Sequence, residues 1–332
     1  MRMKAKPTRI LAVLLTIAAL CVAGAVASRA AVDITDEFTD LNFRAAVYEA
    51  IRKTDPTPIY DTDTAGVKKL FAGARGIESL AGLEYFTGLE ELFCDENRLT
   101  VLPALPGGLT ALDCGRNLLT QLPALPDNLE YLDCSNVDGG KGDPAAALPV
   151  ARLTSLPALP AGLLALDCQE NDLTSLPTLP ATLHSIFASN NKLASLPALP
   201  AALSTLSCDG NRLKSLPALP AGLVSLYCEY NQLASLPALP PGLQYLRCNN
   251  NKLAKLDVTG LSLDQLNCSY NNISNKSAVK GFTGTWDGNY IGFKFDPQND
   301  HFRLWGKLTN WEKSPLHWFL LIVCFGWIWM AF

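Results

Sequence analysis

Residues 206–225 read L-S-C-D-G-N-R-L-K-S-L-P-A-L-P-A-G-L-V-S, and residues 226–245 read L-Y-C-E-Y-N-Q-L-A-S-L-P-A-L-P-P-G-L-Q-Y. Both stretches follow the pattern L-x-C-x-x-N-x-L-x-x-L-P-x-L-P-x-x-L-x-x, and the same 20-residue period can be followed back to Leu92 and forward to Cys268. A unit of this length cannot bury its own leucines, so neighbouring units must stack to form a core. The sequence therefore predicts a solenoid.

Two residue types mark the register of the repeat. Cysteine stands at one position of nearly every unit, with Ala188 in the remaining one: Cys94, Cys114, Cys134, Cys168, Cys208, Cys228, Cys248 and Cys268. Asparagine follows three positions later in most units: Asn97, Asn117, Asn171, Asn191, Asn211, Asn231, Asn251 and Asn271. The step from Cys134 to Cys168 is 34 residues, after which the pattern resumes in phase. We therefore expect the inserted residues, within 137–151, to form a surface loop.

The unit itself predicts its local structure. Leu-x-Cys alternates with period two, so leucine and cysteine should face inward from a short parallel strand while the residue between them faces outward. The asparagine stands where the chain turns away from the strand, and its amide can bond the backbone of the next coil. The L-P-x-L-P run removes backbone donors and favours an extended, polyproline-like back.

The flanks of the repeat have different patterns. An earlier rung without the prolines is expected at residues 70–77, and residues 42–53 have apolar side chains at helical spacing, which predicts an amphipathic capping helix. The domain prediction is a signal peptide over 1–27, an N-terminal helical cap over 28–66, the solenoid over 67–274, a C-terminal capping segment over 275–315 and a hydrophobic tail over 316–332.

Both ends of the chain suggest export. Residues 1–27 begin with four basic side chains, continue with an apolar run and close on Ala25-Val26-Ala27, which is typical of a secretory signal; an uncleaved anchor is the alternative. Removing them leaves 23 basic against 31 acidic residues, so nucleic acid is not an expected partner. Residues 316–332 are free of charged side chains and carry tryptophans near both ends. This tail is expected to associate with a membrane or, alternatively, to pack on the repeat core.

No pattern in the sequence predicts catalysis. The three histidines are scattered, and phosphate-binding loops, nucleophile elbows and HExxH motifs are absent from the sequence. The ladder cysteines all occupy one inward position, which favours reduced, buried thiols that act as small hydrophobic side chains. Some disulfide bridging or metal binding are the alternatives. We predict a protein that is not an enzyme and has no cofactor or metal.

The outward side chains of the predicted strands are the candidate binding residues. They form a rigid, exposed concave surface. The middle rungs are acidic, and the later rungs gather tyrosine and arginine, a composition typical of binding hot spots. The predicted partner-binding residues are Tyr131, Phe187, Tyr227, Tyr245, Arg247, Asp113, Asp133 and Asp167.

The repeat resembles those of bacterial leucine-rich repeat proteins. Its L-P-x-L-P form is most similar to the short repeats of secreted effectors of the YopM and IpaH ubiquitin-ligase types, over residues 67–274. The flanks, with N-F-R-A-A-V at 42–47 and S-A-V-K-G-F-T-G-T-W-D-G at 277–288, look more like surface leucine-rich repeat proteins of Gram-positive bacteria. The resemblance implies a horseshoe with short parallel β-strands on its concave face, an extended convex side and a partner bound on the strands.

Together these patterns predict an exported, non-enzymatic protein, extracellular or at the cell surface, that binds a protein or glycan through its concave face. One alternative is a structural envelope spacer without a specific ligand. Another is a secreted, host-directed effector related to the ubiquitin ligases. That class needs a catalytic cysteine, whereas the only cysteine after the repeats, Cys324, stands in the apolar tail, where a low dielectric raises a thiol pKa and opposes nucleophilicity.

Overall fold

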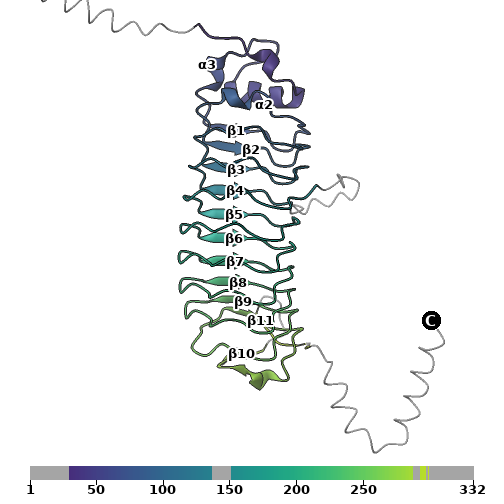
Figure 1. Cartoon of the computed structure of the whole chain (residues 1–332), viewed down its shortest axis with the longest axis vertical. Helices are drawn as coiled ribbons and strands as arrows, with labels where there is room; N and C mark the ends of the chain where they lie inside the picture. Colours follow the sequence, from purple (N-terminus) through teal and green to yellow (C-terminus); the bar gives the residue numbers. More distant parts are fainter. Residues whose placement is uncertain (1–29, 137–150, 287–291, 297, 299–332) are drawn as a thin grey trace, which may run out of the picture.

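A computed structural model describes residues 30–136, 151–286, 292–296 and 298 of the chain. The rungs of the repeat stack in one column, with the helices at the N-terminal end (Figure 1). The elements are η1 (Thr35–Glu37), α2 (Leu41–Ile51), α3 (Asp61–Thr64), β1 (Lys69–Phe71), η2 (Leu83–Tyr85), β2 (Glu91–Phe93), β3 (Ala111–Asp113), β4 (Tyr131–Asp133), β5 (Ala165–Asp167), β6 (Ser185–Phe187), β7 (Thr205–Ser207), β8 (Ser225–Tyr227), β9 (Tyr245–Arg247), β10 (Leu256–Asp257), β11 (Gln265–Asn267), η4 (Lys276–Ala278), β12 (Val279–Lys280) and β13 (Phe293–Lys294).

One parallel sheet runs the length of the column. Its order is β1-β2-β3-β4-β5-β6-β7-β8-β9-β11-β13, so successive rungs pair directly. The register aligns the central leucines, as in Leu92 with Leu112 and Leu132 with Leu166. The latter pair shows that the insertion leaves the ladder in phase. The predicted parallel solenoid is confirmed.

The interior of the column is formed by the repeated positions. The central leucine of each strand and the cysteine two residues later are buried, whereas the residues on either side of the leucine are partly exposed on most strands. This alternation is the predicted one, although each strand is shorter than expected and ends one residue before the cysteine. Residues 101–106 and their equivalents contain neither helix nor strand, in line with the extended back that the prolines predict.

The repeated asparagines connect neighbouring rungs. Asn231 donates from Nδ2 to the backbone oxygens of Cys208 at 2.9 Å and Cys228 at 3.3 Å, and its Oδ1 accepts from the backbone N–H of Leu213 at 2.9 Å. The same contacts recur at Asn191, Asn211, Asn251 and Asn271. The expectation of an amide ladder is confirmed, with one difference: the asparagine bonds the preceding coil rather than the next one. It thereby satisfies buried backbone groups, and the carbonyl of Cys208 accepts from both Asn211 and Asn231.

A left-handed residue forms the corner between each strand and its asparagine. Gly210 has φ +62°, and a Cβ built on it would lie 2.1 Å from Asn190 Oδ1, so a larger residue there would displace the Asn190 side chain. Tyr230 occupies the equivalent corner with φ +51° and is 57% exposed. A non-glycine residue in this conformation is strained.

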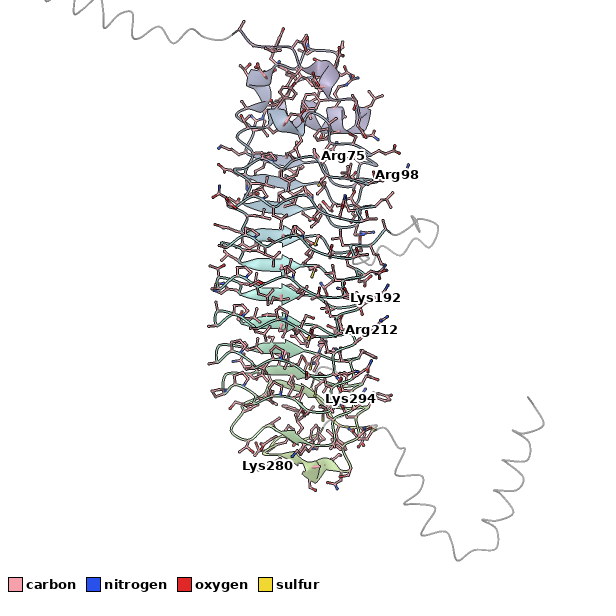
Figure 2. All side chains as sticks on the ribbon, in the orientation of Figure 1. Arg75, Arg98, Lys192, Arg212, Lys280 and Lys294 are labelled. Carbon is pink, nitrogen blue, oxygen red and sulfur yellow. The ribbon has the colours of Figure 1, made fainter. Side chains whose placement is uncertain are left out.

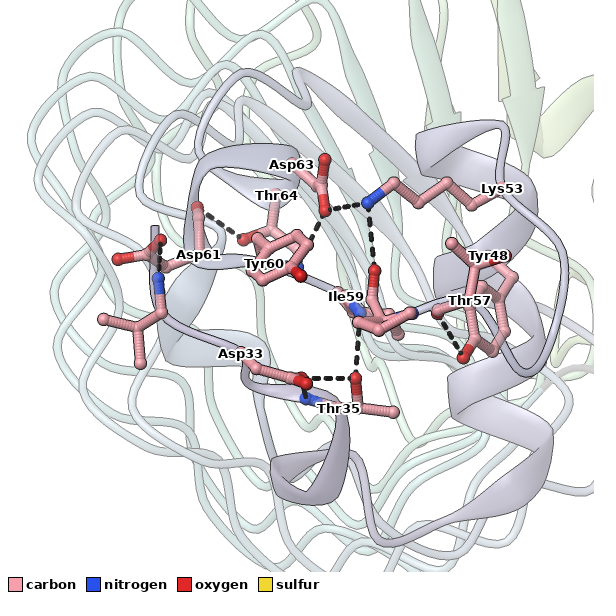
Figure 3. A network of polar contacts seen from close by, with 12 residues as sticks. Asp33, Thr35, Tyr48, Lys53, Thr57, Ile59, Tyr60, Asp61, Asp63 and Thr64 are labelled. Carbon is pink, nitrogen blue, oxygen red and sulfur yellow. Dashed lines mark hydrogen bonds and ion pairs between the residues drawn. The ribbon is translucent and has the colours of Figure 1, made fainter. Parts of the chain in front are cut away.

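The N-terminal end is closed by a polar network and an apolar plug. Figure 3 shows Lys53 with its amine 2.5 Å from Asp63 Oδ2, and the Tyr48 hydroxyl donating to the backbone oxygen of Thr57 at 2.9 Å. Helix α2 begins after Asp40, whose Oδ1 accepts from the N–H groups of Asn42 and Phe43. The side chain of Phe43 is fully buried against the first rungs. The predicted N-terminal cap helix is confirmed.

The C-terminal end has elements that the repeat did not predict. Strand β13 pairs with β11 and extends the sheet by one strand, and β10 pairs with β12 in a separate two-stranded parallel sheet. Phe282 and Trp286 pack here with their rings tilted by 33° and their centroids 4.1 Å apart. The described part of the predicted capping segment thus covers the last rung with strands and aromatic rings.

Several predicted features fall outside the described residues. These are the signal peptide at 1–27, nearly all of the insertion at 137–151 and the apolar tail at 316–332. Within the part of the chain that the structure describes, no helix has the length and apolar character needed to span a bilayer.

Candidate sheet-face binding surface

The exposed side of the long sheet is the candidate site, and we call it the outer sheet face. It is formed by the side chains immediately before and after the central leucine of each strand, together with the residue that follows the cysteine. It corresponds to the face predicted to be concave. Since each strand from β2 to β11 in this sheet is hydrogen-bonded to a neighbour on both sides, these side chains project from a rigid support.

Three aspartates form a column on the middle rungs. Asp113, Asp133 and Asp167 end strands β3, β4 and β5, and they are direct partners in the parallel register. Partial burial, reinforced by the charges of Asp133 and Asp95, raises the pKa of Asp113 to about 7. Partial burial and Asp133 also raise the pKa of Asp167 to about 6. The column therefore holds like charges close together at the cost of mutual repulsion.

Backbone donors fix the orientation of these carboxylates. The N–H of Gly115 donates to Asp113 Oδ1 at 3.2 Å, and that of Ser135 donates to Asp133 Oδ1 at 2.9 Å. Gln169 donates to Asp167 from its backbone and its side chain. In the described ranges, none of the three aspartates forms an ion pair. The column is thus oriented without being neutralised by a cation.

Several cationic side chains of neighbouring rungs lie beside the sheet. Figure 2 shows Arg98, Lys192 and Arg212 along one flank of the column, beside the strands rather than over them. Lys192 pairs with Asp172 at 2.7 Å on that flank. Arg116 pairs with Glu96 at 2.5 Å at the corner of its rung.

Aromatic rings stand before and after the aspartates in the same column. Phe71 of β1 and Phe93 of β2 are register partners whose rings stack at a centroid distance of 5.0 Å, and Phe71 is 60% exposed. Phe187 follows Asp167 on β6 and is half-buried. Tyr131 lies beside the aspartates on β4 and is 51% exposed. Stacked rings on solvent-exposed strands form an apolar patch of the kind found at protein interfaces.

The later rungs bring together part of the predicted tyrosine–arginine set. The guanidinium of Arg247 lies 5.2 Å from the ring centroid of Tyr227, its register partner, and its Nε donates to Gln265 Oε1 at 3.2 Å. Tyr245 lies on the same strand as Arg247, on the other side of Leu246, and is half-buried. A cation–π pair of this geometry holds the arginine over the sheet.

Three buried polar atoms near this pair have no hydrogen-bond partner within the described part of the chain: Glu229 Oε2, Asn249 Oδ1 and Asn267 Nδ2. Burial, reinforced by the charge of Asp209, raises the pKa of Glu229 to about 7, against an opposing effect of Arg247. These atoms are almost completely covered, so they do not offer an open surface to a large partner.

The cysteine column is a feature of the interior. The eight described cysteines are free and buried. The thiols of Cys134 and Cys228 donate to the carbonyl oxygens of the following rung, each at 3.4 Å. Burial raises the pKa of the cysteines, in the case of Cys268 to about 12. The thiols are thus poor nucleophiles, and no cluster suited to hold a metal is found among the described residues.

The structure places all eight predicted binding residues on the outer sheet face, but in two groups. Tyr131, the three aspartates and Phe187 lie on β3 to β6, whereas Tyr227, Tyr245 and Arg247 lie on β8 and β9. Sequence reasoning missed Phe71. The alignment of Leu70 with Leu92 could have identified it, because it places Phe71 in the column of Phe93.

Comparison with solved structures gives a consistent group of relatives. InlJ from Listeria monocytogenes, whose functional domain includes a cysteine ladder, is 27% identical with a TM-score of 0.63, over 74% of this chain and 53% of that one. YopM from Yersinia enterocolitica is 37% identical with a TM-score of 0.52, over 63% and 48%. YopM from Yersinia pestis, a leucine-rich effector protein, is 31% identical with a TM-score of 0.50, over 70% and 72%.

The chain thus spans about half the length of the first two matched proteins. No protein-family model matches the chain, and no curated protein matches it.

Proposed function

Because the chain belongs to the bacterial leucine-rich repeat proteins, we propose that it is an exported, non-enzymatic binding protein that holds a protein partner on its outer sheet face. A single observation carries this proposal. The inward positions of the rungs repeat almost without change, whereas the outward positions vary and carry exposed aromatic and charged side chains. The exposed rings of Phe71 and Tyr131 add apolar area to this face, and contiguous exposed apolar area is typical of protein interaction sites.

The arrangement of the face supports binding of a macromolecule rather than catalysis. Its carboxylates and rings extend over many rungs instead of converging on one point. Extended, rigid surfaces of this kind are what solenoids offer to protein partners. The buried thiols, with their raised pKa, do not provide a nucleophile.

Export is proposed on the sequence of residues 1–27 and on the similarity to internalin and YopM proteins. We place the protein at the cell surface or in the extracellular space. A glycan partner and membrane association through residues 316–332 remain sequence-based proposals of the same kind.

The experiment is a capture assay with the full chain as bait, using extracellular and cell-surface proteins of the source bacterium and of cells it contacts. The face variant is Tyr227→Ala/Tyr245→Ala/Arg247→Ala. The matched control is Val101→Ala/Gln121→Ala/Lys214→Ala, which changes exposed side chains away from the strands. We expect a partner that binds the wild type and the control, and whose affinity for the face variant is at least about tenfold weaker.

If the partner bound the wild type, the face variant and the control equally, its binding site would not be on the rungs of Tyr227, Tyr245 and Arg247. A chain that captures no partner would instead favour the structural spacer, for which outward substitutions have no consequence.

A further inference from the structure

One column of the outer sheet face combines charge and aromatic surface in an ordered way. Reading the residue after the central leucine from β1 to β6, the side chains are Phe71, Phe93, Asp113, Asp133, Asp167 and Phe187. We call this set the acid–aromatic column. Apolar rings thus stand at both ends, and three carboxylates stand between them.

This column is an unpartnered sheet face with unmatched charge. Its aspartates accept hydrogen bonds from backbone or amide N–H groups, but none forms an ion pair within the described ranges. The nearby cations are engaged elsewhere: Arg116 with Glu96, and Lys69 with Glu91 at 2.8 Å. A binding partner with cationic groups would complement the charge that the described residues leave unpaired.

The geometry favours a row of separate cationic groups over a single metal ion. The three aspartates leave successive strands, which lie about 4.8 Å apart in a sheet. They form no cluster able to hold a metal within the described residues. A linear row of carboxylates flanked by rings fits side chains that are themselves spaced along a chain.

Resting on the proposed function, we propose that the acid–aromatic column docks an extended, basic segment of the partner protein. The column covers five rung spacings, or about 24 Å, which corresponds to about seven residues of extended chain. The segment carries two Lys or Arg residues opposite the aspartates and apolar side chains at its ends, against Phe71 with Phe93 and against Phe187.

The same geometry makes docking sensitive to acid. Asp113 faces Asp95 and Phe93 on one side and Asp133 on the other, with Asp167 one rung further, and the Glu96–Arg116 pair lies at the adjoining corner. Partial burial among these like charges raises the pKa of Asp113 to about 7. Protons therefore compete with the basic segment for Asp113 at pH values where an ordinary aspartate stays ionised.

The test begins with a phage-displayed library of random heptapeptides selected on the full chain at pH 8. The strongest peptides are synthesised, and their Kd values are measured for three proteins. These are the wild type, the column variant Asp113→Asn/Asp133→Asn/Asp167→Asn and the charge-matched control Glu78→Gln/Asp127→Asn/Asp172→Asn. The control removes the same number of acidic groups from sites off the face. It therefore distinguishes an effect of the column from an effect of the changed net charge.

We expect the selected peptides to contain at least two Lys or Arg residues with apolar residues at the ends. Their Kd should rise about 10- to 100-fold in the column variant and change less than about threefold in the control. A Phe71→Ala variant should weaken only peptides with an apolar end. Lowering the pH from 8 to 5.5 should weaken binding to the wild type by at least about tenfold and leave the column variant unaffected.

Neutral or acidic peptides as the strongest binders, or equal loss in the column and control variants, would overturn the proposal. A natural partner that is captured and depends on Tyr227 and Arg247, together with basic peptides that ignore the column, would keep the proposed function and reject this docking site. A chain that selects no peptide and captures no partner would reject both.

Discussion

Leu112, Leu132 and Leu166 each stand one residue before an aspartate, yet the two sets of side chains have opposite roles. The leucines are buried in the column, and the aspartates point to solvent from the same three strands. Every inward position must fit its neighbours above and below, so its residue type repeats. Outward positions meet solvent and are free to vary, so departures from the period indicate where binding is to be sought.

The largest effect should come from an inward position. Leu226→Ala removes a fully buried side chain from the middle of the core and is expected to destabilise the protein by about 3–5 kcal/mol. Its neighbour Tyr227 faces outward, and Tyr227→Ala should cost about 1 kcal/mol or less. Urea unfolding followed by circular dichroism measures both. Similar losses of unfolding free energy for the two variants would contradict the different roles assigned to inward and outward positions.

The asparagine ladder should come next. Asn231→Ala leaves the buried N–H of Leu213 without its acceptor and removes one of the two amide donors to the carbonyl of Cys208, the other being Asn211. The loss should cost about 1–3 kcal/mol. The adjacent Gln232→Ala is the control, because its side chain lies at the surface edge of the same rung. A loss below about 1 kcal/mol for Asn231→Ala would show that solvent can replace these bonds.

The reactivity of the cysteine thiols tests whether the inward positions are closed to solvent. Burial raises the pKa of the thiols, so the eight described cysteines should resist alkylation in the folded protein at pH 8 and react in guanidinium chloride. Mass spectrometry of the digested protein reports each position separately. Rapid labelling of Cys134 or Cys228 without denaturant would show that these thiols are not buried in the folded protein.

The smallest effect on stability should come from the outward aspartates, and there a substitution should stabilise the protein rather than destabilise it. The pKa of Asp113 is raised to about 7 in the folded protein, so the folded state binds a proton more tightly than the unfolded state. This group favours folding at low pH, and the benefit is lost as the pH rises from about 4 to 7. Asp113→Asn should therefore raise the Tm by a few degrees at pH 8 and have little effect at pH 4.

Asp172→Asn provides the control for that prediction, since Asp172 is ion-paired with Lys192 on the flank. This substitution should leave the Tm unchanged or lower it slightly at pH 8. Asparagine retains an Oδ1 that can accept from the Gly115 N–H, so a destabilising effect of Asp113→Asn at pH 8 would contradict the repulsion and desolvation assigned to the ionised carboxylate.

Much of this architecture could be predicted from the sequence because the period fixes it. The Leu-x-Cys alternation gave the strands and their inward faces, and the in-phase step from Cys134 to Cys168 gave the direct pairing of β4 with β5. The direction of the asparagine bonds could not be predicted, because a periodic sequence does not distinguish the preceding coil from the next. Strands β12 and β13 also escaped prediction, since residues 279–295 have no repeat from which to read a register, and β10 at Leu256–Asp257 was missed because the repeat predicts an extended back at that position.

The candidate site was predictable only in part. Period two identified which residues face outward, and so placed Asp113 and Tyr227 on one face. It could not show that the Phe71 and Phe93 rings stack, or that Glu229 becomes buried with an unpaired oxygen, because both depend on side-chain packing between rungs. The predicted Tyr227–Arg247 association is present as a cation–π contact.

The central claim is that the inward side of each rung makes the fold and the outward side binds. Its most direct test measures Tm and peptide affinity at pH 8 on the wild type and on Asp113→Asn/Asp133→Asn/Asp167→Asn. We expect the variant to bind the selected peptides at least about tenfold more weakly than the wild type, with a Tm that is unchanged or higher. A variant whose affinity is unchanged, or whose Tm falls together with its affinity, would contradict it.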